Sequence, residues 1–501
     1  MTAGLRATRA YLAARPDADI DWAAAPPRYK RYPPAGRSVL PWNSGSDPLA
    51  GLLRDLMGLR PRWSYPVALT GTARQERPLV DVGRPVPSGG GLHPVELYVC
   101  TGPGSGRAAG LYHYDPAHHC LDLVRPGDHR AAMSGLLDAP PAVLPDLVVA
   151  CTAVFWRNGF KYRDFAYNLQ CQETGALAAQ FLAIAKALDR RASVHVIFRD
   201  REVNALLGVE PAAEGALALL TLGTDTAARI EDLPTAADLT ATPAAAPLDA
   251  SPAVPTTLPH LTRLHTTAAR PTRVRDHVPR YPGAAAGGPR VPLPDARPVR
   301  LADGVAGRAS PLAGYRRDPV DADALAAVLA HAARGYRGDL PGAYAAPVAV
   351  DPHVVVDRVR GLAPGAYRYD ADRNSLVQVG DASAIALVRN GPVHENTGLG
   401  LATAAAVVVP VGDPLDADRG LGDRWYRVLQ IETGLVVHRA ALAAAACDLG
   451  ARIHSDGANR ATDAAIGLTD RPERSLSFLL LGHERRGPRL PAPPPQRREL
   501  P

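Results

Sequence analysis

The chain has 501 residues, which is enough for two to four domains of ordinary size. Hydrophobic residues make up 46%, a normal share for a globular protein, and the net charge of +6 includes no block of like charges. This pattern excludes the concentrated basic footprint of nucleic-acid binding, and no apolar run predicts a membrane span or a signal peptide.

Five cysteines lie far apart, without Cys-x-x-Cys spacing, which predicts reduced thiols, a cytoplasmic protein and no structural zinc. No His/Cys/Glu cluster predicts a metal centre, and the pair His118-His119 is expected to be solvated. Almost every basic residue is arginine, and only Lys30, Lys161 and Lys186 are lysine. A lysine in such a chain is a candidate for work that arginine cannot do, because lysine can lose its proton in a suitable site.

In chain order, the first half predicts strands and helices that do not alternate strictly. Its central stretch, RPVPSGGGLHPVELY at 84–98, places three glycines before an alternating strand pattern. Three glycines remove every Cβ from one backbone surface, so a flat ligand can lie there, although an ordinary glycine turn explains the stretch equally well when taken alone. The other expected elements are helices at 48–57 and 173–188 and strands at 95–100, 111–114, 147–154, 193–198 and 217–222.

The second half repeats the first. Both contain a Glu-Thr-Gly triplet that is expected to open an Ala-rich helix, and both close with a strand ending in Leu-Gly at the same interval. The matching pairs are 110–115 with 365–370, Asp164 with Asp423, Tyr167 with Tyr426, 173–175 with 432–434, and Gly223 with Gly482. The repeat predicts a tandem duplication.

The expected domains follow from this repeat. Half one covers 1–231 and half two 260–484; an Ala/Pro/Thr-rich linker lies at 232–259 and a Pro/Arg-rich tail at 485–501. In half two a helix is expected at 323–333 and strands at 354–356, 405–411 and 476–481. Because strands and helices do not alternate regularly, each half is predicted to be an α+β sheet flanked by helices rather than a doubly wound parallel sheet.

The segments PSGGGLHPVELYV, GLYHYDPAHHCLDLV and FKYRDFAYNLQCQETGALAAQFLAIAKAL together resemble the SagB/McbC-type dehydrogenases. These are FMN enzymes of the nitroreductase superfamily that act on peptide azolines. The resemblance covers most of residues 84–223 and, more weakly, about 305–490. It implies a nitroreductase-like fold with a mixed or antiparallel sheet, present twice. It also implies oxidation of thiazoline or oxazoline rings to thiazoles or oxazoles in a ribosomally made antibiotic peptide, with the azoline-containing precursor peptide and a cyclodehydratase complex as partners.

The resemblance assigns the family's Lys-Tyr pair to Lys161 and Tyr162. Lys161 would take a proton from the azoline or orient the base, Tyr162 would share the proton or position the ring, and the flavin would take the hydride. Base work requires a lysine pKa below its ordinary value, and Arg157 and Arg163 are expected to help lower it. The alternative is a solvated Lys161 and a packed Tyr162.

Family members are normally homodimers with flavin at the interface, and this chain divides the family's features between its halves. The flavin ring would lie against half one, and the phosphate would be held by half two. Half two lacks Ser and Gly at the turn counterpart, 343–352, and has Gly420 and Leu421 where half one has the Lys-Tyr pair. The residues implied for cofactor binding are Pro87, Ser88, Gly89, Gly90, Arg308, Ala309, Ser310, Arg485 and Arg486. The losses predict one FMN, one dead site and a monomeric pseudo-dimer or weak oligomer.

Two other functions remain open at this point. The same scaffold could carry a flavin reductase that uses NAD(P)H, which would not need the Lys-Tyr pair. The chain could also be a non-catalytic scaffold that binds a leader peptide or a partner. Neither a Gly-x-Ser-x-Gly elbow nor a Walker sequence occurs, so serine hydrolase and P-loop chemistry are not predicted.

Overall fold

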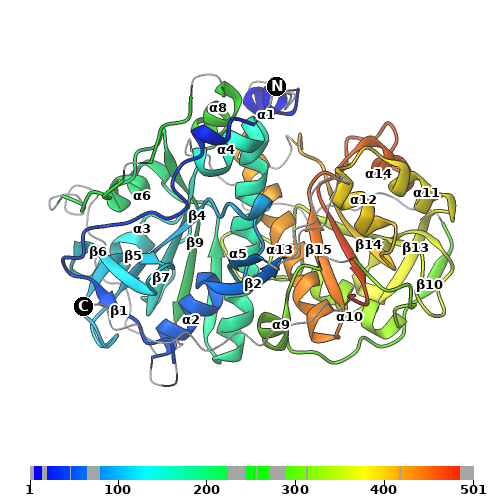
Figure 1. Cartoon of the computed structure of the whole chain (residues 1–501), viewed down its shortest axis with the longest axis horizontal. Helices are drawn as coiled ribbons and strands as arrows, with labels where there is room; N and C mark the ends of the chain where they lie inside the picture. The colour runs from blue at the N-terminus through cyan, green and yellow to red at the C-terminus, as the bar shows by residue number, and fades with distance from the viewer. Residues whose placement is uncertain are drawn as a thin grey trace.

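Two antiparallel sheets, one in each half of the chain, stand on either side of two long helices, α5 (Ala166–Ala187) and α13 (Arg424–Ala446), in a computed structural model (Figure 1). The structure describes residues 5–13, 20–43, 45, 47–64, 79–223, 243–249, 251–255, 258–269, 288–311, 314–416 and 420–485. Figure 1 shows half one in blue to green and half two in green to red. The predicted α+β fold with helix-flanked sheets, present twice, is confirmed.

The first sheet has the strand order β1-β6-β5-β4-β7-β9-β8. Its strands are β1 (Ser38–Val39), β4 (Val95–Thr101), β5 (Gly110–Asp115), β6 (Cys120–Pro126), β7 (Leu147–Val154), β8 (Arg191–His195) and β9 (Glu214–Gly223). Alternate residues of β4 face opposite sides, as strand geometry requires. Leu97 and Val99 pack in the cluster that contains α5, whereas Tyr98 and Cys100 pack toward α3 (Arg130–Gly135) and α6 (Asp200–Leu207). Both sheet faces are therefore covered.

The second sheet repeats this order as β10-β13-β12-β11-β14-β17-β15, with β16 paired to β14. Its strands are β10 (Arg290–Pro292), β11 (Asp351–Val356), β12 (Gly365–Asp370), β13 (Ser375–Gly380), β14 (Ala406–Gly412), β15 (Gly450–His454), β16 (Arg474–Ser475) and β17 (Phe478–Gly482). Its helices are α9 (Leu301–Gly307), α10 (Ala322–Ala332), α11 (Ser383–Asn390), α12 (Glu395–Leu401) and α14 (Arg460–Ala465). One hydrophobic cluster contains residues of both sheets, so the halves share a core.

The two long helices cross at the glycines of the repeated Glu-Thr-Gly triplets. A Cβ on Gly175 would lie 1.9 Å from the backbone oxygen of Ile431, and a Cβ on Gly434 would lie 1.9 Å from that of Gln172. Only glycine permits this approach. The two contacts mirror each other, as a pseudo-two-fold arrangement of duplicated halves requires.

The expectation that each triplet opens its helix is wrong, because α5 begins at Ala166 and α13 at Arg424. The residues before the triplet look like a loop in sequence since several are polar. In the structure they are buried between the helices, where the Gln172 side-chain amide donates to Gln430 Oε1 at 2.8 Å. A polar contact between the halves therefore takes the place of a solvated loop.

Other predicted bounds agree more closely. The helix α2 (Pro48–Met57) and the strand β7 have the expected limits, and α10 begins one residue early. The strand predicted at 193–198 ends instead at His195. Val196 and Ile197 donate their backbone N–H groups to Asp339 of half two, at 3.0 and 2.7 Å, rather than to β9.

The first helix of each repeat contacts the opposite half. Thr8 of α1 (Arg6–Ala13) donates its backbone N–H and its hydroxyl to Asp423 at 2.9 and 2.7 Å. Leu261 of α8 (Pro259–Ala268) donates its N–H to Asp164 at 2.7 Å. Asp164 and Asp423 are matching positions of the duplication, and Figure 1 shows α1 and α8 side by side at the top of the molecule. This exchange interlocks the halves.

Part of the predicted linker is described, and it runs over half one. Ala245 donates its N–H to the Val124 oxygen at 2.9 Å, and Val254 donates to the Ala212 oxygen at 3.2 Å. Residues 224–242 and 486–501, which hold the linker's first part and the predicted tail with Arg486, lie outside the described residues.

The helix α13 is long and apolar enough to span a membrane by length and composition. However, 94% of its most apolar window is buried inside the protein. Burial of this kind is typical of the core helix of a globular fold, which α13 forms here together with α5.

Candidate active site

The Pro-Ser-Gly turn presents bare backbone at the surface of half one. Gly90 and Gly91 have φ values of +64° and +68°, a region that glycine adopts at little cost. The turn is closed by two hydrogen bonds at its serine: the N–H of Gly91 donates to the Ser88 backbone oxygen at 3.0 Å, and that of His93 donates to Ser88 Oγ at 2.8 Å. Both glycines are exposed, so a flat molecule can approach their peptide groups.

The Lys-Tyr pair faces this turn. Both residues end the helix α4 (Trp156–Tyr162), which follows β7. A Cβ on Gly90 would lie 2.6 Å from Tyr162 Oη and 3.2 Å from Lys161 Nζ. The two motifs, about 70 residues apart in sequence, therefore meet at one point, and the glycine leaves room for both polar atoms.

The surroundings shift the pKa values of the two side chains in opposite directions. Burial lowers the pKa of Lys161 below the ordinary 10.5, which favours its neutral, basic form. Burial, together with the Asp456 carboxylate of half two, raises the pKa of Tyr162, which keeps its phenol protonated. The pair thus combines a candidate base with a hydrogen-bond donor.

The expectation that Arg157 and Arg163 lower the lysine pKa is wrong, because burial alone causes the shift. Arg157 points elsewhere: its Nη1 pairs with Glu96 and donates to the His93 backbone oxygen at 3.1 Å. Burial would raise the pKa of Glu96, but Arg157 and His113 outweigh it and hold that pKa well below its usual range. Arg157 therefore stabilises the base of the turn.

Glu173, the glutamate of the first triplet, lies directly beneath the turn. Burial raises its pKa to about 7, against a hydrogen bond from Ser88 and the charges of Arg84 and Arg157. The sequence marked this residue only as part of the repeat. A glutamate next to the Ala-rich, largely apolar run at 175–185 was the available signal that it has a buried partner.

The matching glutamate of half two does similar work. Glu432 accepts the N–H groups of Val348 and Ala349 at 3.1 and 2.6 Å and the Tyr336 hydroxyl at 2.6 Å. In each half, therefore, the glutamate of the triplet accepts hydrogen bonds from the segment that precedes β4 or β11.

Half two contributes an arginine next to the turn of half one. Arg308 follows α9 and donates from Nε and Nη2 to the Pro85 backbone oxygen, at 3.1 and 2.8 Å. Its Nη1 donates to Ser310 Oγ at 3.4 Å, while Ala309 between them is exposed. The predicted Arg-x-Ser thus lies against the stretch that carries Pro87 to Gly90.

The remaining predicted basic residues are placed differently. Arg485 is exposed after β17 and donates its backbone N–H to the Gly314 oxygen at 3.2 Å. Sequence reasoning missed Arg452 on β15, whose Nη1 donates to the Pro311 oxygen at 3.4 Å and which therefore lies beside the Arg-x-Ser segment. Nothing in its sequence surroundings distinguishes Arg452 from the other arginines.

The place related to this site by the duplication has different contacts. Gly338 of half two forms a parallel bridge with Val194 of β8, the strand that matches β15. Asp200 next to it is buried between Arg424 Nη1 at 2.7 Å and Arg427 Nη1 at 2.5 Å. A strand bridge and buried ion pairs therefore lie in this place, whereas the site at Gly90 has an exposed glycine turn.

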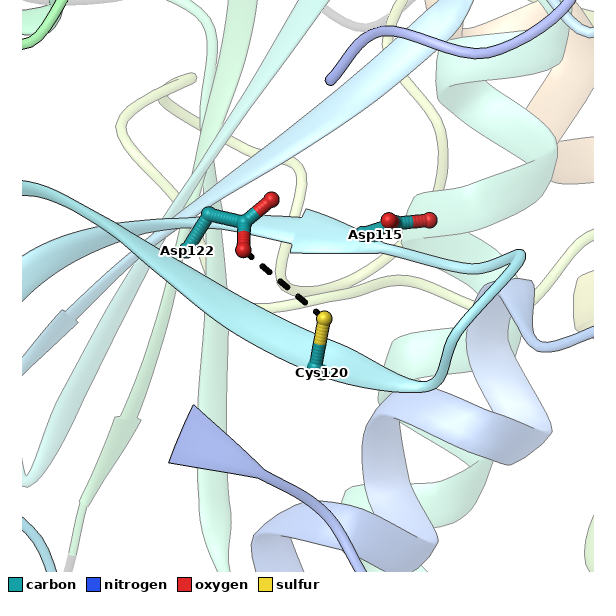
Figure 2. Close-up of side chains that lie close together, drawn as sticks. All are labelled: Asp115, Cys120 and Asp122. Atoms are coloured by element: carbon teal, nitrogen blue, oxygen red, sulfur yellow. Dashed lines mark hydrogen bonds between the residues drawn. The ribbon is translucent and has the colours of Figure 1, made fainter. Parts of the chain in front are cut away.

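One group of buried side chains has the residue types of a metal site. Single ligand atoms of Asp115, Cys120 and Asp122 lie within 4.8 Å of one another on the β5–β6 hairpin (Figure 2). Asp122 Oδ1 accepts from Arg37 Nε at 2.6 Å and from the Cys120 thiol at 3.8 Å. Burial raises the pKa of Cys120 to about 12, so the thiol is neutral, and these contacts indicate a hydrogen-bonded hairpin.

Of the two neighbouring histidines, His118 agrees with the expectation of a solvated pair and His119 does not. His118 is half-exposed and bonds through Nδ1 to Asp115 at 2.6 Å. His119 is fully buried, not solvated: the Tyr114 hydroxyl lies 2.8 Å from its Nδ1, and the ring packs on Trp42. The strand partners of the hairpin enclose it, which the sequence pair alone does not reveal.

Part of the chain is similar in sequence to known proteins. Residues 73–224 match the model of the nitroreductase family. The trifolitoxin-processing protein TfxB of Rhizobium leguminosarum bv. trifolii is 29% identical over 164 residues, which are 31% of this chain and 43% of that protein. The microcin B17-processing protein McbC of Escherichia coli is 26% identical over 128 residues, 24% of this chain and 47% of that protein. The chain thus spans less than half the length of either relative.

The likeness of fold extends over both halves. The crystal structure of a putative nitroreductase from Anabaena variabilis superposes with a TM-score of 0.74 and 23% sequence identity, covering 96% of this chain and all of that one. At that identity the comparison shows the fold, with both sheets and the helices between them.

Proposed function

We propose that this chain, which carries a nitroreductase-family domain over residues 73–224, is an FMN-dependent dehydrogenase that oxidises azoline rings of a ribosomally made peptide to azoles. The observation that carries the proposal is the meeting of Lys161, Tyr162 and the bare face of Gly90. The similarity of the chain to two peptide-processing proteins supports a peptide as the substrate.

The residues around the turn fit a flat, anionic cofactor. A flavin ring needs a wall without side chains, and Gly90 and Gly91 offer exposed left-handed backbone. A phosphate with close to two negative charges needs charge-assisted donors, which Arg308 and Ser310 would supply from half two. FMN would thus be held by Pro87 to Gly90 and by the Arg-x-Ser segment.

When bound, FMN supplies the hydride acceptor of the reaction. The chain's own residues handle the proton. In its neutral form, which burial favours, Lys161 accepts at Nζ the proton that the azoline carbon loses, and the protonated Tyr162 hydroxyl donates a hydrogen bond that holds the reacting ring. One proton and one hydride leave the substrate, so an azoline becomes an azole. Glu173 and Arg157 keep the turn in place from beneath.

Further proposals concern setting and organisation. Five free, buried cysteines support a cytoplasmic protein. A cyclodehydratase that forms the azoline would act before this chain. We also propose the division into halves 1–231 and 260–484 with a linker between them. The chain would act as a monomeric pseudo-dimer, because its two halves share one hydrophobic core.

The decisive experiment mixes the full chain, FMN and a synthetic thiazoline or oxazoline peptide, and follows mass. Loss of two hydrogens per ring is expected. Consumption of NAD(P)H without any mass change in the peptide would favour a nitroreductase-type reductase instead. A protein that purifies colourless and binds no added FMN would favour the scaffold function.

Replacing Arg308 with alanine is expected to weaken FMN binding by about 10- to 100-fold, because a charge-assisted donor to the phosphate is lost. Flavin released by denaturation, measured by absorbance against protein, should fall from one FMN per chain. The control is Arg300→Ala, an exposed arginine at the start of the same helix α9. Full flavin retention by Arg308→Ala, or two FMN per wild-type chain, would contradict a single composite site.

A further inference from the structure

An exposed tryptophan lies beside the candidate base. Trp22 begins the short 3₁₀ helix η2 (Trp22–Ala24), and 61% of its surface is exposed. Its ring centroid is 5.4 Å from Lys161 Nζ, within cation–π range, and the indole packs edge-on against Phe160 with the ring centroids 5.7 Å apart. Exposure of a large apolar ring to water is unfavourable, and packing in the hydrophobic core does not account for the position of this ring.

The indole is held in position by the backbone around it. Asp21 caps η2 by accepting the N–H of Ala23 at 2.9 Å, and the Trp156 indole N–H donates to the Ala24 oxygen at 3.1 Å. A few residues later, Lys30 is buried in an ion pair with Glu214 at 2.6 Å. The exposed ring is therefore pre-organised, so little conformational entropy would be lost when it contacts a ligand.

We propose that Trp22 is a substrate-contacting residue, whose indole stacks on the flat five-membered ring of the peptide and favours heterocycles over unmodified residues. This inference rests on the proposed function. An azoline or azole offers a planar face, and an aromatic pair of this kind contributes about a 2- to 10-fold effect beyond area burial. The position beside Lys161 would bring the ring carbon to the base, and the ring would exclude water from Nζ.

The kinetic test compares Trp22→Ala and Trp22→Phe with wild type, using the full chain loaded with FMN and a thiazoline peptide. For Trp22→Ala, KM should rise about 2- to 10-fold with little change in kcat, and Trp22→Phe should retain most of the affinity. Tyr344→Ala is the matched control: Tyr344 is 73% exposed, in half two, and Arg337 lies over its ring at the same 5.4 Å. That variant should behave like wild type.

A second readout does not depend on turnover. Only Lys30, Lys161 and Lys186 would give signals in protein labelled with ¹³C at lysine Cε. If Trp22 covers Lys161, then Trp22→Ala should shift the Lys161 signal and leave the Lys30 and Lys186 signals in place. Binding of a thiazole peptide, followed by calorimetry, should also weaken in Trp22→Ala.

The outcomes separate the two proposals. If wild type oxidises no azoline peptide, the proposed function fails, whereas weaker thiazole-peptide binding by Trp22→Ala would still support the contact. If wild type turns over and Trp22→Ala matches it in KM and in peptide affinity, the contact is wrong and the function stands. If wild type neither oxidises an azoline peptide nor binds a thiazole peptide, both are wrong.

Discussion

Replacing Lys161 with alanine is expected to reduce azoline oxidation by about 10²–10⁴-fold, because positioned proton transfer is lost. FMN content should stay at the wild-type level, since Lys161 faces Gly90 and Tyr162 and is not among the residues proposed to hold the phosphate. Lys161→Arg should be nearly as inactive, because arginine stays protonated at all useful pH values. Single-turnover rates with a thiazoline peptide measure the effect.

The chain offers a matched control in Lys186, an exposed lysine at the end of α5. Lys186→Ala should leave the rate unchanged. The wild-type rate should rise with pH as Lys161 loses its proton, with a midpoint below the ordinary 10.5 because burial lowers the pKa of Lys161. Turnover of Lys161→Ala at the wild-type rate, or the same pH profile in that variant, would remove Lys161 from the mechanism.

Asp200→Ala is expected to destabilise the protein by about 3–5 kcal/mol, the usual effect of removing one partner from a buried ion pair. Asp200 lies between Arg424 and Arg427 of half two, and all three side chains are buried. Without the carboxylate, the positive charges of two guanidinium groups of half two would stay buried against half one without this ion-pair partner. The denaturant midpoint of unfolding measures the loss.

The surface variant Asp303→Ala, which breaks an exposed pair with Arg300, is the control and should change the midpoint little. Burial alone would raise the pKa of Asp200, but Arg427 and Arg424 outweigh it and the pKa is lowered. The stabilisation is therefore present above the ordinary aspartate pKa and is lost only as pH falls through the lowered folded value. A midpoint of Asp200→Ala equal to wild type at neutral pH would show that the two halves do not depend on this ion pair.

The duplicated α+β plan can be inferred from the amino-acid sequence alone. Residues that recur in register, such as Asp164 with Asp423 and Gly175 with Gly434, predicted two copies of one unit before any contact was known. Apolar periodicity predicted α2 and β7 within their observed bounds, because strand and helix periods are local properties of the chain. The family resemblance, which depends on local motifs, agrees with the match of residues 73–224 to the nitroreductase family model.

The contacts that those elements make could not be predicted from the sequence. Trp22 reaches Lys161, Arg308 reaches Pro85, and each depends on partners far away in the sequence. His119 is buried and α5 begins early because their polar atoms bond across strands or between halves, where periodicity carries no signal. Local patterns determine which elements form, whereas hydrogen bonds and burial between distant segments determine which side chains share a site. The arrangement of Lys161, Tyr162 and Arg308 around the turn at Gly90 depends on such contacts between distant segments.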